Sequence, residues 1–133
     1  MTTREKLDRI AARRVIILDG AMGTEIQRRG LTVADFRAAR FAAHGARLSG
    51  CNDVLCLTRP ALIREIHESY LEAGADIIET CSFSATSIAL AEYGLAEYAY
   101  EISRESARIA CCARDAFSTA EKPRFTAGVM GPL

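Results

Sequence analysis

The stretch VIILDGAMGTEIQRRG at residues 15–30 combines residue types that could bind a small zwitterion. Its apolar run ends on Asp19, and Gly20 and Gly23 follow within four positions. A carboxylate at a strand end could pair with an ammonium group, and small residues let backbone N–H groups approach a ligand carboxylate. Together these groups would suit the charged end of an amino acid. They also fit an ordinary turn, because glycines after strands are mostly turn formers and an aspartate there often caps the next helix.

Polar or glycine-rich residues also follow three other apolar runs. They occupy residues 58–60, 79–83 and 128–132. In parallel α/β folds the carboxyl ends of the strands meet at one edge, where ligands bind. We therefore expect these segments to lie near Asp19. The spacing of Gly20 and Gly23 matches neither a Walker loop nor a dinucleotide-binding fingerprint, which disfavours a nucleotide ligand.

The elements that must position these residues alternate between short apolar runs and helical patterns. The strand candidates are residues 14–19, 53–58, 75–80 and 124–132. Helical patterns cover residues 4–13, 23–30, 34–43, 61–73, 84–93 and 97–117. This alternation predicts right-handed strand–helix–strand units and a parallel sheet of about four strands. The sequence thus divides into an N-terminal helix at 1–14 and an α/β domain at 15–133.

Composition and charge exclude several classes of partner. The 133 residues include 17 basic and 17 acidic side chains, so the formal net charge is zero, which predicts no nucleic-acid and no membrane partner. No apolar run approaches the roughly 20 residues of a membrane span, and the N-terminus lacks the apolar segment of a signal peptide. Five cysteines form an odd set without Cys-x-x-Cys spacing, which predicts reduced thiols and a cytoplasmic protein.

Three segments together resemble a known family. They read ILDGAMGTEIQRRG, GCNDVLCLTRPALIREIHESYLEAGADIIETCSFSATSIALAEYGL and EKPRFTAGVMGPL. They are similar to the opening of the homocysteine-binding domain of cobalamin-dependent methionine synthase, and the similarity runs from about Val15 to the last residue. The closing segment favours methionine synthase over the relatives that use betaine or S-methylmethionine as the methyl donor.

The resemblance implies a fold, a substrate and the residues that bind it. The implied fold is a (β/α)8 barrel, of which this chain would be the N-terminal half. Homocysteine would bind at the carboxyl ends of the strands, with Asp19 contacting its amino group. The residues whose backbone amides would approach its carboxylate are Gly20, Ala21, Met22, Gly23 and Thr24. Glu79 and Thr80 would lie on the rim of the same site.

The resemblance also implies cofactors that this chain would not hold. In the family, three cysteine thiolates bind a zinc ion that ligates the homocysteine sulfur, and separate domains bind cobalamin and folate. The zinc cysteines of the family lie beyond the matching part. Cys111 and Cys112 are adjacent, but neighbours in a helix point about 100° apart, so we expect no metal site there. Cys81 replaces a more usual Asn and could face a ligand. We expect His67 on a solvated helix face, and no partner for His44 is evident.

The sequence does not decide how the chain assembles or which methyl donor it serves. A half-barrel has unpaired outer strands, so we expect it to associate with a second copy or with a polypeptide that carries the remaining strands. We expect no methyl transfer by the chain alone. The alternatives are a betaine- or S-methylmethionine-type homocysteine methyltransferase, and a non-catalytic amino-acid-binding remnant or partner subunit.

Overall fold

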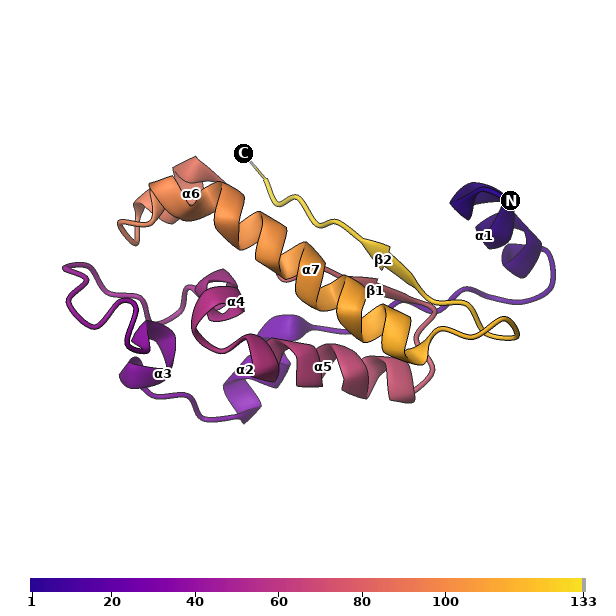
Figure 1. Cartoon of the computed structure of the whole chain (residues 1–133), viewed down its shortest axis with the longest axis horizontal. Coiled ribbons are helices and arrows are strands. Elements are labelled where there is room, and N and C mark those ends of the chain that lie inside the picture. Colours follow the sequence, from indigo (N-terminus) through magenta and orange to yellow (C-terminus); the bar gives the residue numbers. More distant parts are fainter. Residues whose placement is uncertain (133) are drawn as a thin grey trace.

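The structure, a computed structural model, describes residues 1–132 and combines many helices with a small parallel sheet (Figure 1). The helices in chain order are α1 (Thr3–Ala11), α2 (Met22–Arg28), α3 (Val33–Arg37), η1 (Asn52–Val54), α4 (Leu55–Thr58), α5 (Pro60–Glu72), α6 (Ser87–Ala91), η2 (Ala96–Tyr98) and α7 (Ala99–Phe117). The strands are β1 (Ile77–Glu79) and β2 (Phe125–Ala127). Each predicted helix has a counterpart, although α3 and α6 are shorter than their sequence patterns.

The sheet brings three distant chain segments side by side. β1 and β2 pair in parallel, with Ile77 opposite Phe125. On the other side of β1, Leu18 forms a single parallel bridge with Ile77, and the Asp19 amide donates to the Ile77 carbonyl oxygen at 3.0 Å. The carboxyl ends of all three segments therefore point to the same edge of the sheet.

The prediction of about four strands is wrong in two places. Residues 53–58 are helical, within η1 and α4, and Val54, Leu55 and Cys56 are buried. A short apolar run cannot be assigned to a strand or to a buried helix from its pattern alone, and here the helix forms. Residues 14–19 run alongside β1, but only Leu18 makes a bridge.

An ion pair between Arg14 and the buried Asp76 holds the segment before Asp19 against β1. The Asp76 side chain is fully buried, and Arg14 donates to both of its carboxylate oxygens at 2.7 Å. The Ile17 amide donates to the same carboxylate at 2.9 Å. The Arg14 hydrogen bonds lower the pKa of Asp76 to about 2. Asp76 thus fixes the position from which Asp19 projects.

Helices α5 and α7 pack against each other and against the sheet (Figure 1). Pro60 occupies the first turn of α5, and Gly74 follows the helix with φ of 111°, the left-handed conformation that favours glycine after a helix. The core between these elements includes Leu71, Ile78 and Ala110, all without solvent exposure. No helix within residues 1–132 is both long and apolar enough to cross a membrane.

The two histidines differ from their expected settings. His67 lies in α5 and is completely buried, so the expected solvated position is wrong. Neither of its ring nitrogens has a hydrogen-bond partner among residues 1–132, and burial lowers the pKa of His67 to about 4. His44 does have a partner, because its Nε2 lies 2.7 Å from the Tyr93 carbonyl oxygen.

Candidate functional site

A pocket of about 540 Å³ opens at the carboxyl ends of the three sheet segments. Seven of the eight predicted site residues line it: Asp19, Gly20, Ala21, Met22, Gly23, Glu79 and Thr80. Thr24 is not among the lining residues. The 58–60 segment also lies outside the pocket lining, because it joins α4 to α5 instead of ending a strand.

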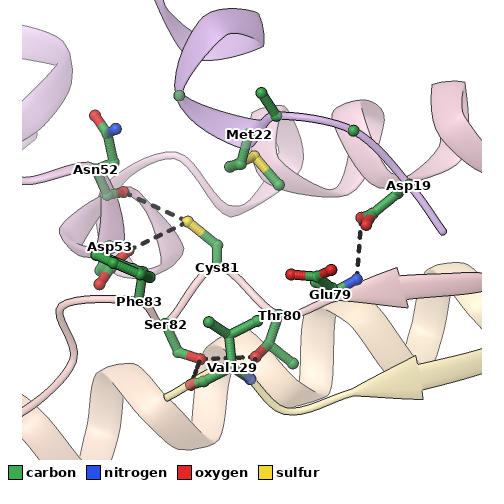
Figure 2. A pocket seen from close by; sticks show the side chains of 13 residues that line it. Asp19, Met22, Asn52, Asp53, Glu79, Thr80, Cys81, Ser82, Phe83 and Val129 are labelled. Carbon is green, nitrogen blue, oxygen red and sulfur yellow. Dashed lines mark hydrogen bonds between the residues drawn. The ribbon is translucent and has the colours of Figure 1, made fainter. Parts of the chain in front are cut away.

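Asp19 is fixed at one side of the pocket by the backbone of β1. Its Oδ2 accepts a hydrogen bond from the Glu79 amide at 3.0 Å, which aligns the carboxylate with the end of the strand (Figure 2). Burial raises the pKa of Asp19 to about 6. A cationic partner would stabilise the ionised form of Asp19, because its charge compensates for the water contacts that burial removes.

The chain at Gly20 lies close to the Tyr70 ring. A Cβ atom at Gly20 would lie 2.9 Å from the Tyr70 ring. The Tyr70 hydroxyl donates to the Ala21 carbonyl oxygen at 3.1 Å and holds this turn against α5. The glycine therefore serves packing as well as access to the pocket.

A hydrogen-bond network joins the loops that follow β1 and β2. The Thr80 and Ser82 hydroxyl oxygens lie 2.7 Å apart, and Ser82 donates to the Val129 carbonyl oxygen at 2.9 Å. The Val129 amide donates back to Thr80 Oγ1 at 2.9 Å. Figure 2 shows this network at the edge of the pocket near the end of β2. Thr80 thus supports the pocket wall as well as lining it.

Sequence reasoning missed Asn52 and Asp53, which line the side of the pocket away from Asp19 (Figure 2). Asp53 had been placed at the start of a strand. Its carboxylate accepts from the Ser84 amide at 2.7 Å and from the Cys81 thiol at 3.5 Å. Cys81, which the sequence places where it could face a ligand, lines the pocket and is 4% exposed.

The described pocket lining is acidic. It contains the carboxylates of Asp19, Asp53 and Glu79, and none of its members is Arg, Lys or His. Such a wall favours a positively charged ligand group. Among the described lining residues, only neutral donors could meet a ligand carboxylate. This distribution suits an ammonium group near Asp19.

The cysteines do not fit a zinc site. Within residues 1–132, no group of three or more His, Cys, Asp or Glu side chains could hold a metal ion. Burial raises the pKa of Cys51 to about 11, and the neighbouring Cys56 thiol together with burial raises the pKa of Cys81. In the metal-free protein both shifts favour the neutral thiol. Cys111 and Cys112 lie on α7, as predicted, and are half-buried.

Comparison with known proteins assigns the family. Residues 16–133 match the family described as homocysteine S-methyltransferase. The chain belongs to this family. Two solved structures are also similar, both of the homocysteine methyltransferase MmuM from Escherichia coli. The oxidized form is 30% identical with a TM-score of 0.73, and the match covers 95% of this chain and 40% of that one. The metallated form is 32% identical with a TM-score of 0.68, covering 97% and 41%.

These matches support the coarser part of the sequence interpretation. Homocysteine S-methyltransferase membership and a mixed α/β fold similar to part of a homocysteine methyltransferase are established. The chain spans about two fifths of the length of the solved relatives. The two structures are MmuM enzymes, so they do not single out the methionine-synthase type that the closing segment had favoured.

Proposed function

We propose that this chain forms the homocysteine-binding part of an enzyme that transfers a methyl group to homocysteine and yields methionine. The observation that carries the proposal is the acidic pocket at the carboxyl ends of the sheet segments, in a chain of the homocysteine S-methyltransferase family. Asp19 binds the substrate ammonium group, and its ionised form is the one that binds. Glu79 and Thr80 line the adjacent rim.

Backbone amides bind the other charge of the amino acid in this proposal. Gly20 and Ala21 lead into α2, which begins at Met22, and the first N–H groups of this helix lack intrahelical partners. The small side chains of Gly20, Ala21 and Gly23 leave these amides accessible to a carboxylate. The ammonium group of homocysteine would then contact the Asp19 carboxylate, and its carboxylate would contact backbone N–H groups of the same turn.

Activation of the sulfur requires groups that the described residues do not provide. A zinc ion, when bound, lowers the pKa of the homocysteine thiol so that a thiolate is present at neutral pH. We propose that the zinc ligands lie outside these 133 residues. The chain alone then binds the amino-acid end of the substrate and performs no methyl transfer.

Two methyl donors are compatible with this acceptor site. The EKPRFTAGVMGPL segment favours the methionine-synthase type, in which cobalamin bound to another domain carries the methyl group. The similarity to MmuM favours the S-methylmethionine type. Supplying each donor to the assembled enzyme separates the two, because only one will support methionine formation.

The assembly that we propose is a barrel completed by further strands. Apolar side chains are exposed along the segment that bridges β1, with Val15 at 79%, Ile17 at 53% and Leu18 at 54%. Burying them against additional strands, in the same polypeptide or in a partner, would remove this surface from water. In isolation the chain would self-associate. The five unpaired cysteines suit a cytoplasmic setting.

Titration with L-homocysteine, followed by backbone amide resonances, tests the binding role. We expect saturable shifts at Gly20, Gly23 and Glu79 in the millimolar range, and at least about tenfold weaker binding in Asp19→Asn. Asp115→Asn is the matched control, because Asp115 is an exposed carboxylate on α7 outside the pocket. Equal affinities of Asp19→Asn and wild type would remove Asp19 from the site.

A further inference from the structure

Asp53 is a buried carboxylate without a cationic partner. It is 5% exposed, and none of the ion pairs among the described residues includes it. Burial raises the pKa of Asp53, so its ionised form is disfavoured where it lies. A carboxyl group in such a place is costly unless its oxygens are hydrogen-bonded. The hydrogen-bond partners of Asp53 therefore indicate its role.

Both carboxylate oxygens of Asp53 accept hydrogen bonds from residues of a single loop. The Ser84 amide donates to Oδ2 at 2.7 Å, and the Cys81 thiol lies 3.5 Å from Oδ1. These partners are at the two ends of residues 81–84, which we call the 81–84 loop. The loop contributes Cys81, Ser82 and Phe83 to the pocket lining. Asp53 thus bonds to both ends of a segment whose middle faces the ligand space.

The 81–84 loop is fastened on its other side by the network already described. Ser82 donates to the Val129 carbonyl oxygen at 2.9 Å and contacts the Thr80 hydroxyl at 2.7 Å. In Figure 2 the two attachments lie on different sides of the loop, with Asp53 toward the helical segment and Ser82 toward β2. The loop is therefore held between η1 and the sheet.

We infer that Asp53 is a positioning residue that fixes the 81–84 loop as the pocket wall across from Asp19. The role in substrate binding rests on the proposed function, whereas the anchoring of the loop does not. Each oxygen of Asp53 accepts from one end of the loop, and the residue is only 5% exposed, so its role is to hold the loop in place. Cys81 acts as a thiol hydrogen-bond donor in this arrangement, which gives it a use that requires neither metal nor thiolate.

Two substitutions separate anchoring from direct charge contact. Asp53→Asn keeps an oxygen that can accept from the Ser84 amide and removes the charge, whereas Asp53→Ala removes both. We expect Asp53→Asn to bind L-homocysteine within about threefold of wild type and Asp53→Ala to bind at least about tenfold more weakly. If Asp53→Asn binds as weakly as Asp53→Ala, the charge itself matters and the inference is wrong. Wild-type affinity in Asp53→Ala would also overturn it.

Amide hydrogen exchange tests the anchor without any ligand. In the wild-type chain the Ser84 amide should exchange at least about tenfold more slowly than in Asp53→Ala, with Asp53→Asn close to wild type. If Asp53→Ala does not fold, Asp53→Asn and wild type suffice, because a wild-type Ser84 amide that exchanges as fast as an unprotected amide excludes the anchor. Slow exchange at Ser84 in a chain that does not bind homocysteine would refute the proposed function and leave the anchor intact.

Discussion

The buried His67 gives the protein a pH-dependent stability that can be isolated by one substitution. The side chain is 0% exposed in α5, and no described residue forms a hydrogen bond with either ring nitrogen. Burial lowers the pKa of His67 from 6.5 to about 4. Between these values the unfolded chain binds more protons than the folded one, so the contribution of His67 to stability falls as the pH falls. That contribution is complete above pH 6.5.

The size of the effect follows from the two pKa values of His67. From pH 7.5 to pH 4.5, the free energy of unfolding should lose about 2.5 kcal/mol through this residue. The raised pKa of Asp19 acts in the opposite direction over nearly the same range, because the folded state then holds the extra proton. The total pH dependence is therefore flatter than the contribution of His67 alone.

His67→Leu isolates the contribution of His67 to the pH dependence of stability, because it leaves Asp19 unchanged. Leu has a similar volume and no polar atom to bury, so the variant should be at least as stable as wild type at pH 7.5. Its advantage should grow by about 2.5 kcal/mol at pH 4.5. Urea unfolding of both proteins at the two pH values measures this difference. An advantage that stays constant with pH would show that His67 is not held neutral in the core.

Three further predictions concern the sheet edge and the pocket. Asp76→Ala should lower the free energy of unfolding by about 2 kcal/mol in urea melts, because it removes the bonds from Arg14 and the Ile17 amide; an unchanged midpoint would contradict the role of this pair. Homocysteine affinity should fall about tenfold from pH 7 to pH 5, since protonation of Asp19 with its pKa of about 6 removes the charge; pH-independent binding in calorimetry would argue against it. Gly20→Ala should destabilise the chain by about 1–3 kcal/mol through its clash with Tyr70, and a thermal melt like that of wild type would show that the turn can shift.

Much of the fold follows from local patterns, but its pairings do not. The apolar spacing of residues 61–73 predicts α5, and the apolar run at residues 75–80 predicts β1. The pair between Arg14 and Asp76 joins residues 62 positions apart, and no local pattern indicates it. His67 shows a different failure. Its position shares a helix face with Ile63 and Leu71, which predicts burial, whereas its polar type suggested solvent exposure.

The pocket also has a part that the sequence predicts and a part that it does not. The turn at 19–23 and the end of β1 were predicted because strand ends of a parallel sheet meet at one edge. Asp53 was missed because the apolar run that follows it was assigned to a strand. Once residues 52–58 form helices, Asp53 moves from the start of a strand to the pocket wall. Its partners Cys81 and Ser84 become evident only in three dimensions.

Titration with three ligands tests the central claim most directly. L-homocysteine carries the ammonium group, the carboxylate and the thiol; 2-aminobutanoate lacks the thiol, and 4-mercaptobutanoate lacks the ammonium group. If the chain binds the charged end of the amino acid through Asp19, the first two should shift the amides of Gly20 and Glu79 with similar millimolar affinity, and the third should not. Equal binding of 4-mercaptobutanoate, or zinc-dependent micromolar binding of homocysteine by the chain alone, would contradict the account.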